Sequence, residues 1–411
     1  MELLAITGVE DKLQDEVALT IESLRSAGIQ VWMLTGDKVE TATCIAISAG
    51  FKDRRQQIFY MRDIESYNEA DRVLSDFERR TNTLLMIDGG TLDLILAHSS
   101  LEERFLRSAS QAPAVCVCRC SPTQKAIITS KIGEFTGKRT CSVGDGGNDV
   151  GMILQSNVGV GIVGKEGMQA SLASDFSIDE FKKLRRLILW HGRLSYKRSA
   201  VLSQFVIHRG LIISVIQAIF SCIFYFVAIP IYNGMLILGY ATVYTCLPVF
   251  SLVFDHDVSV DIVMKYPPLY ATLQKGRSLS VKTFLIWFFK SVFQGCVIML
   301  GTIMFFHESF TNIVTITFSA LIFTELLNVY TSVHHLNWRI LSSSVLTLFI
   351  YILSIALLPQ YFDTSYIEWM FVVKVLLITV VSWMPLHLVH CIVDRVDPSE
   401  FQKIMKEERH R

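Results

Sequence analysis

The second half of the chain contains apolar runs that are long enough to cross a membrane, and this feature limits the fold more than any other. Of the 411 residues, 51% are hydrophobic and 11% are aromatic, and they concentrate after about residue 184. A helix of about 20 apolar residues can span a bilayer. The sequence predicts six spans, at residues 200–224, 227–254, 283–306, 312–333, 341–358 and 369–393.

Basic residues beside these runs predict the orientation of the spans, because Lys and Arg collect on the cytosolic flanks of membrane proteins. They precede the first span at Lys182, Lys183, Arg185, Arg186, Arg193, Lys197 and Arg198, and follow the second at Lys265, Lys275, Arg277 and Lys282. Both flanks are therefore expected in the cytosol. Residues 1–14 lack the basic and apolar regions of a signal peptide. Lys plus Arg (38) balances Asp plus Glu (38), so charge indicates no nucleic-acid partner.

The first part of the chain has the pattern of an α/β domain. Short apolar runs between turn residues are typical of buried parallel strands. They occur at residues 3–7, 29–34, 84–87, 114–118, 140–143 and 158–163, with helical periodicity between them. This alternation predicts a doubly wound, Rossmann-like parallel sheet. The expected organisation is an α/β domain over 1–180, a stalk helix over 181–199, six spans over 200–393, and a cytosolic tail over 394–411. The stalk is expected to be a rigid rod that carries movement into the membrane, and a simple amphipathic juxtamembrane helix is the alternative.

Polar motifs follow three of the expected strands, at the strand ends where such sheets bind their ligands. The first motif is Thr-Gly-Asp-Lys at residues 35–38. The hydroxyl of Thr35 and the backbone amides at Gly36 and Asp37 could hold phosphoryl oxygens. We therefore expect Thr35 to be a phosphate donor.

The second motif runs from Arg119 to Lys125. Ser121 is a suitable N-cap and Pro122 a suitable first helical residue, so Lys125 is expected in the first turn of a helix. A lysine in that position can neutralise charge on a phosphoryl group.

The third motif is Gly-Asp-Gly-Gly-Asn-Asp at residues 144–149. Asp145 and Asp149 supply hard oxygen ligands of the kind that Mg²⁺ prefers, and Asn148 is expected to face the phosphate. The three motifs together predict a site for Mg²⁺ and phosphate.

Two other patterns have plainer interpretations. Gly-x-Gly-x-x-Gly at residues 159–164 matches a dinucleotide motif, but its glycines lie inside a strand-like run. Cys116, Cys118 and Cys120 alternate, so a strand would place all three on one face, where a thiolate metal site is conceivable. Buried reduced thiols are the preferred interpretation.

Ionisable residues inside the expected spans are His208, Arg209, Lys290, Glu325 and Lys374. Such groups are costly in a membrane and carry a functional hypothesis by default. Lys290 and Lys374 are expected to be structural. Two interpretations of Arg209 stay open, an ion pair with Glu325 and a contact with a lipid headgroup.

The second span disfavours transport of small cations, which requires carboxylates or amides inside the membrane. Its apolar run ends before Asp255 and Asp257 and contains only Asn233, near the far edge. A bulky amphipathic substrate fits better.

Together the motifs resemble the phosphorylation domain of P-type ATPases, which has a haloacid-dehalogenase-like fold. Gly-Lys-Glu-Gly at 164–167 and His-Gly-Arg at 191–193 with Ser195-Tyr196 resemble the type IV branch, the phospholipid flippases. Residues 195–209 resemble the sub-branch that works without an accessory subunit.

The resemblance implies an ATP-driven enzyme that moves phospholipid toward the cytosolic leaflet through an aspartyl phosphate, in Golgi and endosomal membranes. It implies Mg²⁺ as cofactor, bound by Asp145 and Asp149. It assigns phosphoryl and nucleotide contacts to Thr35, Gly36, Asp37, Arg119, Lys125, Asn148 and Asp149.

Several parts of the family pattern are missing from this sequence. These are the phosphorylated Asp of Asp-Lys-Thr-Gly-Thr, the nucleotide-binding and actuator domains, and the first four spans. Loss of the strand that carries this Asp is expected to open the sheet in the middle and expose unpaired edges. The chain is thus expected to be the carboxyl-terminal part of a flippase, from a truncated gene model, a late start codon or a splice form, and inactive alone.

Two alternatives remain. The chain could be a non-catalytic interaction or dominant-negative module in the membrane. It could instead be a membrane-tethered phosphatase, for which Asp88, followed by Gly89 and Gly90, is the one visible nucleophile.

Overall fold

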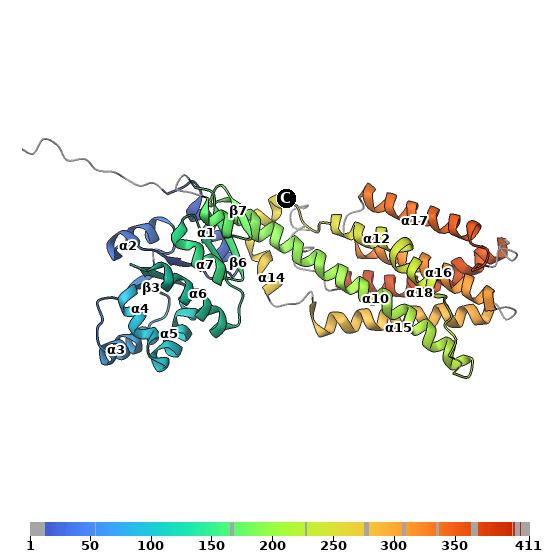
Figure 1. Ribbon diagram of the computed structural model, residues 1–411, viewed down its shortest axis with the longest axis horizontal. Coiled ribbons are helices and arrows are strands. Elements are labelled where there is room, and N and C mark those ends of the chain that lie inside the picture. Colours follow the sequence, from blue (N-terminus) through green and yellow to red (C-terminus); the bar gives the residue numbers. More distant parts are fainter. Residues whose placement is uncertain are drawn as a thin grey trace, which may run out of the picture. The chain divides into compact units, whose positions relative to one another are not determined.

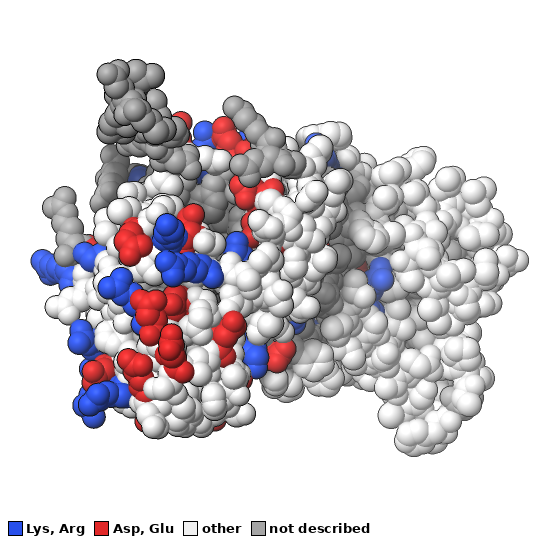
Figure 2. All heavy atoms as spheres, turned by 60° about the vertical axis from the view of Figure 1, so that its left-hand side comes forward, with Lys and Arg blue, Asp and Glu red and all other residues white. Residues whose placement is uncertain are grey.

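The computed structural model describes residues 13–53, 55–164, 168–226, 228–274, 279–305, 310–333, 337–362 and 369–396, together with 398 and 403. The chain divides into two compact units, Met1–His191 with Val263–Ala271, and Gly192–Ile262 with Thr272–Arg411. The strand expected at residues 3–7 and most of the expected tail lie outside the described residues. Charged side chains of both signs cover the first unit, whereas the visible surface of the second carries few (Figure 2).

The first unit alternates strands and helices (Figure 1). Its strands are β1 (Trp32–Leu34), β2 (Gln57–Met61), β3 (Thr83–Asp88), β4 (Ala114–Cys118), β5 (Cys141–Gly144), β6 (Val158–Ile162) and β7 (Phe176–Ile178). Its helices are α1 (Val17–Ser26), α2 (Val39–Ser48), α3 (Tyr67–Glu78), α4 (Gly89–Leu96), α5 (Ser99–Gln111), α6 (Pro122–Thr136), η1 (Gly147–Asp149), α7 (Val150–Gln155), α8 (Gln169–Ala173) and α9 (Lys183–Arg186), with the short η5 (Pro267–Tyr270).

The described strands form two parallel sheets instead of one. The first has the order β1-β4-β3-β2 and the second the order β5-β6-β7. In the first, Trp32 pairs with Val115 and Asp88 with Cys118, and in the second Gly144 pairs with Gly161. The α/β parallel-sheet prediction is confirmed. The division into two sheets among the described strands agrees with the expected opening, whose cause stays a prediction. The edge strands β1 and β5 are the ones that lead into the first and third motifs.

Helices cover both faces of the first sheet, which explains the continuous apolar runs in its central strands. Buried side chains from α3, α4, α5 and α6 form one cluster with the strands, and those from α1 and α2 form another on the opposite face. All residues of β3 and β4 are therefore buried. The edge strand β2, by contrast, exposes Gln57 and Tyr60, and its weaker apolar signal explains why no strand was predicted there.

The second unit is helical (Figure 1). Its elements include α10 (Arg193–Ile223), α11 (Gly234–Gly239), η3 (Tyr240–Tyr244), α12 (Cys246–Ser251), η4 (Leu252–Phe254), α15 (Val281–Phe305), α16 (Phe310–Ser332), α17 (Trp338–Leu357) and α18 (Trp369–Val396). Among the described residues, six helices are long and apolar enough to cross a membrane, with α11 to η4 forming the second. This confirms the prediction of six spans.

The helix α16 forms the centre of this unit. In the most apolar 18-residue stretch of α16, 83% of the residues are buried. The corresponding stretches of α10, α17 and α18 are each 22% buried. Because α16 contacts protein on most sides, it can carry Thr, Asn and Glu side chains that lipid would not accept. The second span begins at Gly234, later than expected, because Asn233 is the N-cap of α11, its side chain accepting from the backbone N–H of Met235.

Candidate functional site

The start of α6 places a lysine in contact with the acidic motif. A capping box fixes this start: Ser121 Oγ accepts from the Gln124 backbone N–H, and Gln124 Oε1 accepts from the Ser121 N–H. Lys125, one residue later, places its Nζ 2.8 Å from Oδ1 of Asp149. The two side chains are only 12% and 13% exposed. The predicted cap is confirmed, and it links the second motif to the third.

The loops after β1 and β4 are held together through their backbones. The Cys120 N–H donates to the Thr35 carbonyl and the Arg119 N–H to the Asp37 carbonyl, each at 2.9 Å. Arg119 adopts a left-handed conformation with φ of 48° to make this turn. Since the same turn leads into α6, the contacts connect Thr35, through Lys125, with Asp149.

The side chain of Thr35 is oriented by its own motif. Its hydroxyl donates to Oδ2 of Asp37 at 2.8 Å and accepts from the Asp37 backbone N–H at 3.1 Å. This local turn fixes the hydroxyl at the end of β1, on the edge of the first sheet. The Asp37 and Arg119 side chains are exposed.

Glycines of the third motif make room for its aspartate. A Cβ atom at Gly144 would lie 2.4 Å from the Cβ of Asp149, so only glycine lets that side chain fold back over the strand end. The Asp149 N–H donates to the Gly146 carbonyl at 3.1 Å, which closes the turn. Asp145 and Asn148 are exposed on the same turn.

The donors of this turn suit Mg²⁺. Asp145 and Asp149 provide carboxylate oxygens, and Lys125 balances the charge of one of them. The described residues contain no group of three or more His, Cys, Asp or Glu placed to hold a metal. Two carboxylates fit Mg²⁺, because this ion keeps several waters and takes phosphate oxygens as further ligands.

Asp88 has a structural role that argues against the phosphatase alternative. It is 7% exposed at the end of β3. Its Oδ1 accepts from the Thr91 N–H at 2.9 Å, and its Oδ2 from the Asp63 N–H at 3.1 Å. Both oxygens are thus used in capping α4 and in holding a neighbouring turn.

The expectation that three cysteines share one face is wrong. Cys116 and Cys118 belong to the cluster beneath α1 and α2, whereas Cys120 packs in the cluster on the opposite face. Cys120 lies beyond the end of β4, after the left-handed residue Arg119, so the alternation of the strand no longer applies to it. Burial raises the pKa of Cys116 to about 12 and of Cys118 to about 11, so these thiols stay protonated at neutral pH.

The glycines of the dinucleotide-like motif serve packing. A Cβ at Gly159 would lie 2.5 Å from the Ile153 side chain, and one at Gly161 would lie 2.4 Å from the Cα of Ser171. They therefore let α7 and α8 approach β6. Lys165, Glu166 and Gly167 of the flippase-like element lie outside the described residues.

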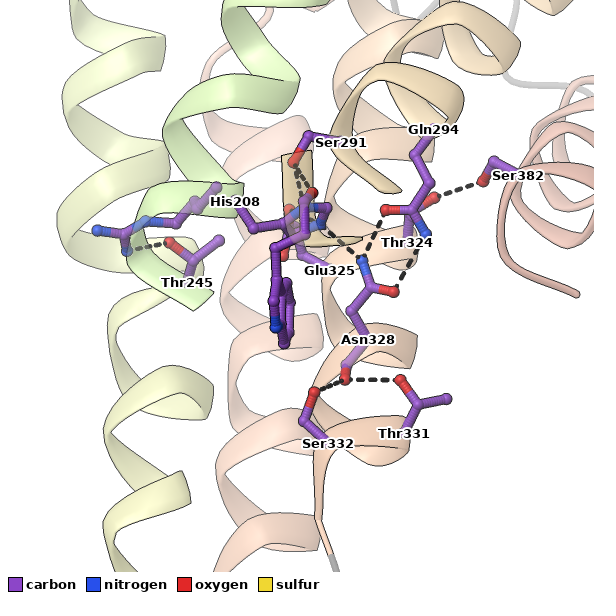
Figure 3. A network of polar contacts seen from close by, with 12 residues as sticks. His208, Thr245, Ser291, Gln294, Thr324, Glu325, Asn328, Thr331, Ser332 and Ser382 are labelled. Atoms are coloured by element: carbon purple, nitrogen blue, oxygen red, sulfur yellow. Dashed lines mark hydrogen bonds and ion pairs between the residues drawn. The ribbon is translucent and has the colours of Figure 1, made fainter. Parts of the chain in front are cut away.

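A second polar site lies inside the second unit, which we call the membrane unit because it contains the six apolar helices. The site lies between α10, α15 and α16 (Figure 3). His208 of α10 is fully buried, with Nδ1 2.6 Å from Ser291 Oγ and Nε2 3.1 Å from Asn328 Nδ2. Asn328 also pairs reciprocally with Gln294 at 3.0 and 3.1 Å. Glu325 is one turn away, with Oε1 3.6 Å from His208 Nε2.

Glu325 and Arg209 form no direct ion pair. Arg209 donates from Nη1 to Thr245 Oγ1 at 2.7 Å and to the Ala241 carbonyl at 3.2 Å. Glu325 instead accepts from the Tyr240 hydroxyl at 3.3 Å. Of the two interpretations of Arg209, the one in which it pairs with Glu325 is therefore contradicted.

The two span lysines have simple partners. Lys290 lies over the ring of Trp287, 4.6 Å from its centroid, and Lys374 Nζ is 3.5 Å from the Phe305 carbonyl. These contacts agree with the structural roles expected of both lysines.

Asp257 was not identified as a site residue from the sequence alone. Its partners are Arg193 and Lys197, which were used only to predict the orientation of the spans. Arg193 Nη1 donates to Oδ1 at 2.9 Å, Nη2 lies 2.8 Å from Oδ2, and Lys197 Nζ lies 2.5 Å from the same oxygen. Burial raises the pKa of Asp257, but the charges of Lys197 and Arg193 outweigh it and hold that pKa below its usual value. The position of this aspartate, shortly after the apolar run of the second span, was the sequence signal that could have identified it.

Comparison with known proteins identifies the family. The model of the phospholipid-translocating P-type ATPase C-terminal region matches residues 171–399. A probable phospholipid-transporting ATPase IIB of Bos taurus is 51% identical over 405 residues, which are 98% of this chain and 36% of that relative. The phospholipid-transporting ATPase NEO1 of Saccharomyces cerevisiae is 46% identical over 410 residues, 99% of this chain and 35% of the relative.

The chain therefore spans about a third of the length of the curated relatives it matches, and nearly all of it is covered. The matched family region includes all six apolar helices. The α/β domain before it is covered by the relatives' sequences. This chain belongs to the phospholipid-translocating P-type ATPase family.

Proposed function

We propose that this chain is the carboxyl-terminal part of an ATP-driven phospholipid translocase that moves phospholipid toward the cytosolic leaflet through an aspartyl phosphate. Family membership and six apolar helices support a role in a membrane enzyme. The relatives are described as phospholipid-transporting ATPases. The substrate and the energy source are taken from those relatives, of which this chain covers about a third.

The observation that carries the proposal is the contact between Lys125 and Asp149, which joins two motif loops at strand ends. In our proposal Asp145 and Asp149 hold Mg²⁺, which screens phosphate charge when bound. Lys125 then turns from Asp149 toward the phosphoryl group, whose charge it neutralises. Thr35 and Asn148 orient the phosphoryl oxygens.

The proposed contacts of Gly36, Asp37 and Arg119 with phosphate and nucleotide follow from the hydrogen bonds that join the turns after β1 and β4. We assign the backbone amides of Gly36 and Asp37 to the phosphoryl oxygens, and the Asp37 N–H, which donates to the Thr35 hydroxyl, must then exchange that partner for the phosphoryl group. Arg119 is exposed in the adjoining turn, and we assign it to the nucleotide. We assign residues 1–180 to a partial phosphorylation domain, 181–199 to a stalk helix and 394–411 to a cytosolic tail. Golgi and endosomal membranes, and action without an accessory subunit, belong to the same proposal.

The 411-residue chain alone should form no phosphoenzyme, because its sequence contains no Asp-Lys-Thr-Gly-Thr. The edges of β1 and β5 support this, since each motif strand lacks a partner on one side among the described strands. Incubation with radiolabelled ATP and Mg²⁺ should leave the chain unlabelled. A hydroxylamine-sensitive label on the purified chain would contradict this part of the proposal.

Transport is tested by joining this chain to the preceding part of the human relative, which is 49% identical over 416 residues. The chimera, in proteoliposomes, should move fluorescent phosphatidylethanolamine or phosphatidylserine when ATP and Mg²⁺ are added. Asp149→Asn should lower the rate by about 10²-fold, the order seen when one electrostatic group is removed from an active site. Asp93→Asn is the matched control, because Asp93 is exposed on α4.

A chimera that inserts and binds ATP but moves neither lipid would contradict transport. An equal loss in the Asp93 and Asp149 variants would contradict the assigned magnesium site instead.

The unpaired edges of β1 and β5 also favour a second candidate, a non-catalytic module that associates with a complete pump. Co-expression with the full-length human relative separates the two. Co-purification together with a loss of its transport would favour the module, and no association would exclude it.

A further inference from the structure

The carboxyl group of Glu325 is buried, and no described Lys or Arg side chain lies within ion-pair distance of it. Glu325 lies on α16 and is 2% exposed. Its Oε1 accepts from the Tyr240 hydroxyl at 3.3 Å, while its Oε2 is buried and has no hydrogen-bond partner among the described residues. An ionised carboxylate in such surroundings is far more costly than a neutral acid.

His208 does not supply the missing charge. Ser291 Oγ already donates to the Trp287 carbonyl at 2.9 Å, so the 2.6 Å contact with His208 requires Nδ1 to carry the proton. The other nitrogen, Nε2, accepts from the Asn328 amide at 3.1 Å. The imidazole is therefore neutral, and its 3.6 Å contact with Glu325 is no ion pair.

The amide of Asn328 enforces this state. Its Nδ2 also donates to Gln294 Oε1, and its Oδ1 accepts from Gln294 Nε2, at 3.0 and 3.1 Å (Figure 3). A proton on His208 Nε2 would face the Asn328 N–H unless both amides turned over together. The paired amides thus hold the imidazole neutral.

Other charged groups around the carboxyl are occupied elsewhere. On α10, Arg209 donates to Thr245 and Ala241, and on α15, Lys290 lies over Trp287. Neither lies within 4.0 Å of a Glu325 oxygen, and in the described part of the chain His208 is the one basic side chain at that distance. The helix α18 contacts this turn of α16 through a neutral hydrogen bond, between the hydroxyls of Thr324 and Ser382 at 3.0 Å.

We propose that Glu325 is a proton-binding site inside the membrane unit, with its carboxyl group held protonated and neutral at physiological pH. Oε1 is the carbonyl oxygen that accepts from Tyr240, and Oε2 carries the proton. If the proton leaves the carboxyl group, His208 Nε2, which lies 3.6 Å from Oε1, can accept it once Asn328 and Gln294 turn over. Proton occupancy is thereby coupled to the contacts that join α10, α15 and α16.

Infrared difference spectroscopy on the full 411-residue chain in lipid nanodiscs tests this inference at neutral pH, independently of any transport activity. Glu325→Gln should remove an absorption of a protonated carboxyl group that shifts in D₂O. Glu22→Gln, on the exposed face of α1, should instead remove only carboxylate absorption. Loss of carboxylate absorption in Glu325→Gln would overturn the proposal, because it would show an ionised Glu325.

Tyr240→Phe provides a second test that keeps the acid in place. It removes the donor to Oε1, so the carboxyl absorption of Glu325 should persist and move to higher frequency. Absence of any protonated-carboxyl absorption that responds to this substitution would also overturn the proposal.

Discussion

Replacement of Asp257 by Asn should destabilise the membrane unit strongly. Asp257 is 5% exposed, and its two carboxylate oxygens contact the two terminal nitrogens of Arg193. Arg193 is itself 3% exposed. It also contacts Lys197, whose side chain is 30% exposed. The substitution removes the negative charge but leaves both cations.

The expected cost is about 3 to 5 kcal/mol, the range for breaking a buried ion pair by removal of one partner. Most of it comes from Arg193, which cannot reach water, whereas Lys197 can turn outward and contributes little. Replacing Arg193 by Met and Asp257 by Leu together should recover most of this cost, because no buried unpaired charge then remains and Lys197 can turn toward water.

The difference in the free energy of unfolding between wild type and Asp257→Asn is measured by unfolding with sodium dodecyl sulfate in mixed micelles. Far-ultraviolet circular dichroism follows the loss of helix. Asp261→Asn is the matched control, since Asp261 is exposed on the same segment. Because the folded pKa of Asp257 is lowered, its stabilising effect is full above the unfolded pKa of about 3.9. It is lost as the pH falls through the lower folded pKa, so wild type and variant should converge there.

Equal stability of the Asp257 and Asp261 variants at neutral pH would refute this reasoning. So would a gap between wild type and Asp257→Asn that widened as the solution became more acidic.

Three further predictions concern the first unit. Gly144→Ala should cost about 1 to 3 kcal/mol because its Cβ would lie 2.4 Å from an aspartate side chain, whereas Gly146→Ala has its nearest neighbour at 3.9 Å; urea unfolding compares them. Asp88→Ala should cost about 0.5 to 2 kcal/mol through loss of the α4 N-cap, measured in the same way, and an unchanged midpoint would contradict that cap. Cys116, whose pKa burial raises to about 12, should resist iodoacetamide at pH 8 while the exposed Cys44 reacts; equal labelling by mass spectrometry would contradict its burial.

Much of the fold could be predicted because its signals are local. The apolar runs of β3 and β4 are buried on both faces and were recognised, and so was the capping box that begins α6 at Pro122. The edge strand β2 has the same length as β4 but mixes exposed and buried positions, so it lacks the continuous burial that marks a central strand. The second span was expected too early because the cap at Asn233 outweighs the apolar residues before it.

The candidate phosphate site could be predicted in part, because three motifs at strand ends indicate a shared edge. Thr35, Lys125 and Asp149 were each named from sequence, and their roles remain predictions. What no pattern contained was the direct pairing of Lys125 with Asp149, or the backbone bonds that align the turn of Thr35 with that of Cys120.

By itself, then, the sequence determined the class of each segment: a parallel α/β domain, its motif loops, and six apolar helices. Tertiary structure alone decided the partners. Cys120 does not share the face of Cys116 because β4 ends before it, at a left-handed residue, and Arg209 donates to Thr245 instead of pairing with Glu325. The physical reason is that periodicity and capping act within a few residues, whereas ion pairs and buried hydrogen bonds depend on which distant helices pack together.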